Sequence, residues 1–176
     1  MALYSFYLAL PITNRLPTDL PDSRREIGQL LLSASWHPTA PHIFNPDARR
    51  VIFGQLGLPV ANDGYSWKDW ETIAPALYQY NEQAMANADV FLAAVDPPGS
   101  GGVGGEIMMV SGSEMSPKPI VLIPNDSGAV CSAMIYGRVM ERAADRTLRL
   151  AFDPNEPDKF LGMVTEFCDL FYYGRG

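Results

Sequence analysis

The sequence predicts an α/β protein in which a mainly parallel sheet of five strands lies between two layers of helices. Its 176 residues are a usual length for one domain with a full core. Two continuous apolar runs, residues 89–95 and 119–123, are typical of strands that are covered on both faces. Segments with helical patterns separate the strand candidates, and this alternation indicates a parallel sheet.

The first half of the chain contains two expected strands and two expected helices. Residues 3–10 are apolar and aromatic and end at a proline, so they predict the first strand. A capping box at 23–26 precedes leucine and isoleucine at helical spacing, which predicts a helix that ends near Trp36. A short strand is expected at 42–44. Residues 45–65 predict an irregular excursion over the surface, with a short helix near 49–56.

The second half predicts the remaining elements. A helix is expected to start near residue 68 or 74 and to end at 87, and Pro75 either kinks it or marks its first turn. Trp67 and Trp70 form either the apolar face of a helix start or the wall of a base pocket. A glycine loop, helices at 106–114, 129–143 and 160–172 and a strand at 148–152 complete a single domain over 1–176. Its expected class is a Rossmann-like or flavodoxin-like three-layer sandwich.

The composition restricts the possible partners. The chain has 20 Asp and Glu against 13 Lys and Arg, a net charge of -7, which argues against binding of a nucleic acid duplex. Two cysteines and two histidines suggest neither a disulfide framework nor a His-built metal site, so no metal or cofactor is expected. The chain shows no membrane-length apolar run and starts without the basic region of a signal peptide. We therefore expect a cytoplasmic protein that does not bind membranes.

The glycine-rich stretch 97–105 is the most informative candidate site. Ligands of parallel α/β sheets bind at the carboxyl ends of the strands, and backbone N–H groups beside a helix start suit an anion. The stretch matches neither the GxGxxG of a dinucleotide site nor a Walker loop. It is expected to place Glu106 at the first turn of a helix, where the dipole favours the ionised form that a nucleophile needs. Alternatively, Glu106 only caps the helix.

Several segments together resemble the nucleoside 2-deoxyribosyltransferase superfamily. They are residues 87–95, 100–107 and 118–123. The spacing Ser-x-Gly-x-x-x-Glu from Ser100 to Glu106 resembles the branch that hydrolyses nucleoside 5'-monophosphates, because the transferase branch usually has Asp in place of Ser100. Residues 131–135, Cys-Ser-Ala-Met-Ile, resemble a motif of deoxynucleoside monophosphate hydrolases, and the segment around Tyr7 resembles the family's first strand. The resemblance spans roughly residues 4–135, without a counterpart for 45–65.

The resemblance implies roles for individual residues. Glu106 would be the nucleophile that attacks the anomeric carbon, and Tyr7 would orient its carboxylate. The 5'-phosphate would bind Ser100 with the amides of Gly101 and Gly102, helped by Ile12, Thr13, Asn14 and Arg15. Ser132 and Met134 would reach into the site of a neighbouring subunit, which implies a homodimer or a higher homo-oligomer. Alternatively, Tyr7 is a core residue, Arg15 is a solvated surface residue, and the 132–134 segment belongs to an ordinary amphipathic helix.

One position departs from the family pattern. Family members carry an aspartate eight residues before the equivalent of Asp89, and this chain has Asn81 there. An amide forms hydrogen bonds but cannot deliver a carboxylic proton to the leaving base. Glu82 is adjacent, but it projects about 100° further around a helix. The sequence therefore leaves three functions open: nucleotide N-glycosidase, deoxyribosyltransferase, or a nucleotide-binding module without turnover.

Overall fold

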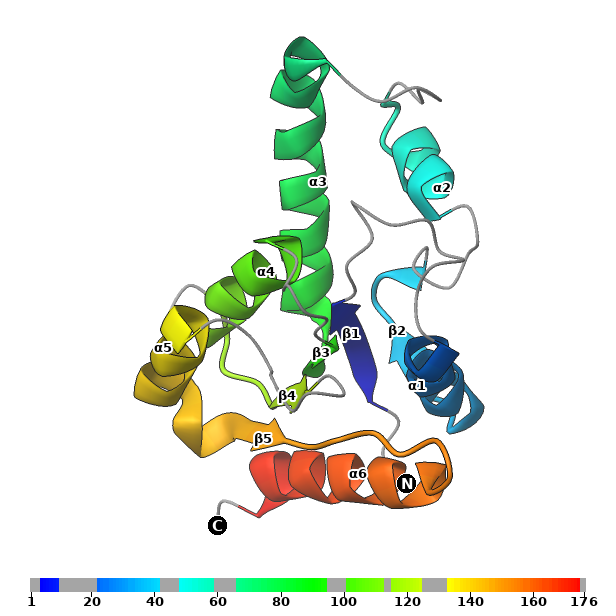
Figure 1. Ribbon diagram of the computed structural model, residues 1–176, viewed down its shortest axis with the longest axis vertical. Helices are drawn as coiled ribbons and strands as arrows, with labels where there is room; N and C mark the ends of the chain where they lie inside the picture. Colours follow the sequence, from blue (N-terminus) through cyan, green and yellow to red (C-terminus); the bar gives the residue numbers. More distant parts are fainter. Residues whose placement is uncertain are drawn as a thin grey trace.

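A computed structural model of the chain describes residues 4–9, 22–41, 48–58, 66–94, 101–112, 115–124 and 133–174. Within these residues, five strands form one all-parallel sheet with the order β2–β1–β3–β4–β5 (Figure 1). The strands are β1 (Ser5–Ala9), β2 (His37–Pro38), β3 (Val90–Ala94), β4 (Ile120–Ile123) and β5 (Thr147–Arg149). The predicted α/β class with a five-stranded parallel sheet is confirmed.

Helices cover both faces of this sheet. The helices of the described residues are α1 (Asp22–Ser33), α2 (Ala48–Gln55), α3 (Trp67–Asn87), α4 (Gly101–Ser111), α5 (Ala133–Ala143) and α6 (Pro157–Tyr173), and all but α2 contribute to the two clusters on the sheet. Apolar side chains of α1 and α6 form a core cluster with one face of the sheet, and those of α3, α4 and α5 form a second cluster with the other face. The three-layer arrangement follows from these two clusters.

The central strands are mostly apolar because each of their faces meets helices. In β1, Phe6 and Leu8 belong to the cluster with α1 and α6, whereas Tyr7 and Ala9 belong to the cluster with α3, α4 and α5. Strands β3 and β4 alternate in the same way, and every residue of both is buried. This alternation places the Tyr7 side chain on the same side of the sheet as α3 and α4.

The second strand lies earlier than the sequence predicted. The expectation at 42–44 lies outside the described residues, whereas His37 and Pro38 pair with β1. The backbone N–H of His37 donates to the carbonyl of Tyr4 at 3.0 Å, and that of Thr39 donates to Phe6 at 2.9 Å. Pro38 lacks an N–H group, but β2 is an edge strand, where a missing donor is tolerated.

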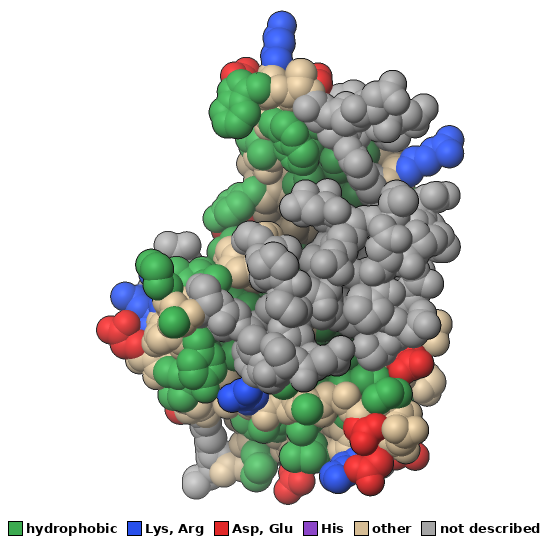
Figure 2. All heavy atoms as spheres, viewed as in Figure 1, with side chains coloured by type: hydrophobic (Ala, Val, Ile, Leu, Met, Phe, Trp, Pro, Cys, Tyr) green, Lys and Arg blue, Asp and Glu red, His purple; other side chains and the backbone are tan. Residues whose placement is uncertain are grey.

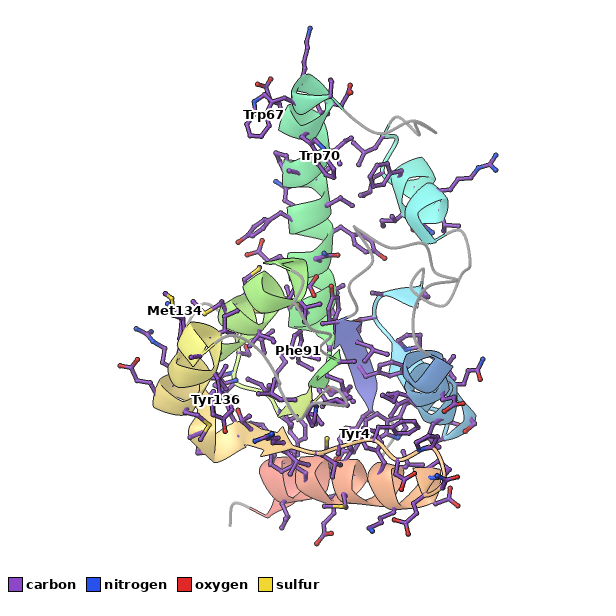
Figure 3. All side chains as sticks on the ribbon, in the orientation of Figure 1. Tyr4, Trp67, Trp70, Phe91, Met134 and Tyr136 are labelled. Carbon is purple, nitrogen blue, oxygen red and sulfur yellow. The ribbon has the colours of Figure 1, made fainter. Side chains whose placement is uncertain are left out.

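Helix α3 begins at a capping box that the sequence analysis did not identify. The Ser66 hydroxyl accepts from the backbone N–H of Asp69, and the Asp69 carboxylate accepts from the backbone N–H of Ser66. Pro75 therefore lies inside the helix and does not mark its first turn. Trp70 packs in a small apolar cluster with Phe53 of α2, whereas Trp67 is 82% exposed (Figure 3).

A buried lysine holds the C-terminal end of α3. The Lys118 ammonium donates to the carbonyls of Met85, of Ala86 at 3.1 Å and of Ala88 at 2.6 Å. These carbonyls lie at the end of the helix, where no later residue of the helix can pair with them. Burial lowers the pKa of Lys118, and the charge of nearby Arg146 acts in the same direction while Asp89 opposes it. Lys118 thus acts as a C-terminal cap that fixes α3 beside the sheet.

Candidate active site

Two side chains from distant segments donate hydrogen bonds to one carboxylate oxygen of a third residue, Glu106. The Tyr7 hydroxyl donates to Oε1 of Glu106 at 2.8 Å, and Nδ2 of Asn81 donates to the same oxygen at 3.0 Å. Tyr7 comes from β1, Asn81 from α3 and Glu106 from α4. The sequence expected these three residues in one site, and the structure brings them into direct contact.

Strand pairing fixes the position of Tyr7. Tyr7 and Phe91 are register partners in adjacent parallel strands, and their rings stack with centroids 5.8 Å apart and an interplanar angle of 7°. Both rings belong to the buried cluster beneath α3 and α4. A hydroxyl on a ring held in this way has a restricted direction, and here it points at Glu106.

Residues 101–105 of the glycine-rich stretch are helical, although the sequence predicted a loop there. Helix α4 begins at Gly101, so Glu106 lies in its second turn and the predicted first-turn position is wrong. A Cβ atom on Gly104 would lie 2.6 Å from Cδ1 of Ile135 in α5. Gly104 therefore permits close packing of α4 against α5, and this packing explains a small residue inside a helix. Val103 and Ile107 of the same helix pack in the buried cluster on this face of the sheet.

The environment of Glu106 disfavours its charge. Burial raises the pKa of Glu106 to about 7, although the hydrogen bond from Tyr7 acts in the opposite direction. The helix dipole was expected to favour the ionised form because Glu106 was placed in the first turn; in the second turn the dipole effect is weaker, and burial acts in the opposite direction. Burial, together with the Glu106 charge, also raises the pKa of Tyr7 well above its usual value. Near neutral pH the carboxyl is therefore divided between its two protonation states while Tyr7 remains a donor.

This raised pKa predicts a pH-dependent stability. The folded state binds the Glu106 proton between about pH 4.5 and 7, whereas the unfolded state releases it, so stability should fall as pH rises through that window. The shift corresponds to about 3 kcal/mol. We expect urea unfolding to show that wild type loses about this much stability relative to Glu106→Gln between pH 4.5 and 7, because glutamine does not titrate. A constant difference would contradict the burial of an ionisable carboxyl.

The other predicted site residues are only partly described. Gly101 and Gly102 form the first turn of α4, where backbone N–H groups lack partners within the helix. Met134 lies in the first turn of α5 and is 86% exposed. The remaining predictions fall outside the described residues, namely Ile12, Thr13, Asn14, Arg15, Ser100 and Ser132.

The sequence analysis missed Tyr80 as a neighbour of the site. Tyr80 precedes Asn81 on α3, its pKa is raised by burial, and its phenol contributes to the raised pKa of Tyr7. Tyr80 also packs on the cluster that joins α2 to α3. Its position next to Asn81, which the resemblance places in the site, could have indicated Tyr80 from the sequence.

A separate groove of about 670 Å³ lies along α6. Trp36 borders it and belongs to the core cluster on the α1 and α6 face, whereas Tyr7 belongs to the cluster on the opposite face. Three carboxylates line the groove, those of Asp158, Glu166 and Asp169. The sheet therefore separates this groove from Glu106.

Three further observations bear on function. Within the described ranges, no group of three or more His, Cys, Asp or Glu side chains is arranged to hold a metal ion. The helices of this part of the chain include none with the length and apolar composition needed to cross a membrane. Comparison of the sequence with protein-family models and curated proteins, and of the fold with solved structures, gives no match.

Proposed function

We propose that this protein is a cytoplasmic N-glycosidase that hydrolyses a nucleoside 5'-monophosphate to a free base and a ribose or deoxyribose 5-phosphate. The observation that carries the proposal is the Glu106 carboxyl, half-buried and oriented by hydrogen bonds from Tyr7 and Asn81. Both donors bind Oε1, and among the described residues no hydrogen bond ties Oε2. Such an arrangement suits a nucleophile whose second oxygen faces the substrate.

The proposed reaction proceeds in two steps. Oε2 of Glu106 attacks the anomeric carbon and the base departs, which leaves a glycosyl ester on Glu106. Water then attacks that ester and releases the sugar phosphate. The N–H groups of Gly101 and Gly102 at the start of α4 suit the 5'-phosphate, because the first N–H groups of a helix are unpaired and its N-terminal end favours negative charge. The resemblance to nucleotide N-hydrolases across Ser100 to Glu106 supports the same substrate class.

A substrate panel tests this function against its alternatives. The protein is incubated with nucleosides and nucleoside 5'-monophosphates, and released base is quantified by chromatography. Base release from monophosphates alone supports the hydrolase. Transfer of the sugar to an added free base would identify a deoxyribosyltransferase instead. Nucleotide binding without base release, unchanged in Asn81→Asp, would identify a binding module, and neither binding nor release would exclude all three functions.

Replacement of Tyr7 by phenylalanine should move the pH dependence of base release to higher pH. The hydrogen bond from Tyr7 lowers the pKa of Glu106, so its loss removes a contact that opposes the effect of burial and raises that pKa further. We expect about a tenfold lower kcat at neutral pH and partial recovery at higher pH. The pH–rate profile of Tyr7→Phe against wild type measures this shift. An unchanged profile would show that Tyr7 has only a packing role.

We also propose that the active form is a homodimer or a higher homo-oligomer. The proposal is supported by Met134, a large apolar side chain that projects from α5 and is 86% exposed (Figure 3). Apolar side chains are visible on the same side of the molecule over α3 and α5 (Figure 2). Sedimentation of Met134→Asp should show dissociation, whereas Met163→Asp on α6, also exposed, should sediment as wild type. A monomeric wild-type protein would contradict the proposal.

A further inference from the structure

The amide of Asn81 occupies the position where a proton donor would be useful. Its Nδ2 donates to Oε1 of Glu106 at 3.0 Å, beside the donation from Tyr7 at 2.8 Å. An amide does not ionise, so Asn81 can position the carboxylate but cannot protonate a leaving base. Burial and the neighbouring Glu106 charge make Tyr7 a weaker acid than an ordinary tyrosine. Both described partners of the carboxylate are thus neutral donors that keep their protons.

The nearest acids in the described part of the chain do not fill this role. Glu82 follows Asn81 directly, but successive residues project about 100° apart around a helix. Glu106 itself cannot attack as a carboxylate and donate a proton in the same step. Among the described residues, burial and not a neighbouring charge raises the pKa of Glu106. No second carboxylate acts on it there, in contrast to glycosidases that divide the reaction between two carboxyl groups.

Breaking an N-glycosidic bond moves an electron pair onto the base nitrogen. A neutral base would leave as an anion unless an acid protonates it, and such protonation typically contributes about a hundredfold or more. A base that already carries a positive charge leaves as a neutral molecule and needs no proton. That the described residues place no acid beside the nucleophile therefore matters greatly for substrates with a neutral base and little for substrates with a cationic base.

We infer that the substrate is a nucleoside 5'-monophosphate whose base carries a fixed positive charge, as in N-ribosyl pyridinium or N7-alkylated purine nucleotides. This inference rests on the proposed function, because it assigns the base of that same reaction. Asn81 is then a positioning residue whose amide makes the site selective for bases that leave without protonation.

The electrostatics of the site favour such a substrate. A cationic ring next to the buried Glu106 would favour the ionised nucleophile and relieve part of the cost of its burial. The chain carries a net charge of -7, and a positive base offsets part of the negative charge of the 5'-phosphate, so such a nucleotide is repelled less than one with a neutral base.

The reaction has a distinctive proton balance. Glu106 forms a bond to the anomeric carbon while the bond from that carbon to the base nitrogen breaks. The electron pair of the breaking bond stays on the nitrogen and neutralises the positive charge of the base. Water then cleaves the ester, and its oxygen stays on the sugar as a hydroxyl. The remaining proton of this step goes to solvent, so hydrolysis acidifies the solution by one proton per base. Hydrolysis of a neutral N-glycoside releases none, because the free base keeps that proton.

Matched substrates test the inference. We would compare 7-methylguanosine 5'-monophosphate with guanosine 5'-monophosphate, and include nicotinamide mononucleotide as a pyridinium substrate, each corrected for its uncatalysed rate. We expect kcat/KM for at least one cationic substrate to exceed that for the neutral nucleotide by about a hundredfold or more, with proton release equal to base release. Equal rates for cationic and neutral substrates would overturn the inference and leave the N-glycosidase standing. Base release from no substrate of either kind would overturn the proposed function itself.

Two variants on α3 test the role assigned to Asn81. Asn81→Asp introduces a carboxyl beside Glu106, and one of two such neighbouring groups holds a proton near neutral pH. We expect this change to raise kcat/KM for guanosine 5'-monophosphate by about tenfold and so to reduce selectivity. Gln83→Glu makes the same change of amide to carboxyl at an exposed position, and its selectivity should equal that of wild type. Unchanged selectivity in folded Asn81→Asp would show that the amide does not determine the substrate class.

Discussion

Replacement of Glu106 by glutamine is expected to reduce base release by about a thousandfold or more. Glutamine is nearly isosteric, and its side-chain oxygen can accept the same hydrogen bonds from Tyr7 and Asn81. It cannot form the glycosyl ester, because an amide oxygen is a poor nucleophile. The variant should still bind nucleotide, since the proposed phosphate contacts come from the first turn of α4. Base release and nucleotide binding by the same preparation separate these two effects.

A neighbouring carboxylate provides the control. Glu82→Gln makes the same chemical change on α3, one residue from Asn81 but about 100° around the helix. Its base release should stay within about threefold of wild type, as expected for a change away from special contacts. Glu106→Gln should also be more stable than wild type at pH 8, because it does not place a charged carboxylate in this partly buried position. Equal loss of activity in both variants would argue against Glu106 as the nucleophile.

Replacement of Lys118 by methionine is expected to destabilise the protein by about 3 kcal/mol. The change leaves the carbonyls of Ala86 and Ala88 without the ammonium that pairs with them at the end of α3, whereas the carbonyl of Met85 still accepts from the backbone N–H of Ala88 at 3.3 Å. Each unpaired buried acceptor costs about 1 kcal/mol or more, and part of this cost is offset because the ammonium no longer has to be desolvated. For a chain of this size the melting temperature should fall by about 10 °C.

An exposed lysine gives the comparison for this second variant. Lys159 forms a surface ion pair with Glu156 at 2.7 Å, and its side chain is 68% exposed. Such pairs contribute little, so Lys159→Met should change the free energy of unfolding by less than about 0.5 kcal/mol. Urea unfolding of both variants and wild type at one pH measures these differences in the free energy of unfolding. Equal stability of Lys118→Met and wild type would show that the carbonyls find other partners.

The apolar patterns predicted the layers of this fold because burial on two faces leaves a clear trace in the sequence. Strands β3 and β4 consist of apolar residues alone, and both were predicted within a residue or two of their observed ends. The edge strand β2 was not predicted, and the strand expected at 42–44 lies outside the described residues. A proline is compatible with an edge strand when its missing N–H group needs no partner, and only the pairing with β1 shows which case applies.

The candidate site was predictable in its residues but not in its local geometry. Tyr7, Asn81 and Glu106 were selected partly through resemblance, and their contacts join three separate elements. The glycines before Glu106 suggested a loop because glycine is a poor helix former. Tertiary packing outweighs that preference here, since Gly104 lets α4 approach Ile135 closely. The ionisation of Glu106 could not be predicted either, because burial depends on side chains that are distant in sequence.

The capping of α3 by Lys118 has a mechanical consequence. The helix is fixed at its C-terminal end and extends about 30 Å to Trp67, whereas Asn81 lies only about 9 Å from the fixed end. A tilt about that end which carries Trp67 through about 3 Å therefore displaces Asn81 by only about 1 Å. A tilt of α3 about its fixed end would therefore displace Trp67 and the attached α2 while it keeps the Asn81 amide within reach of Glu106.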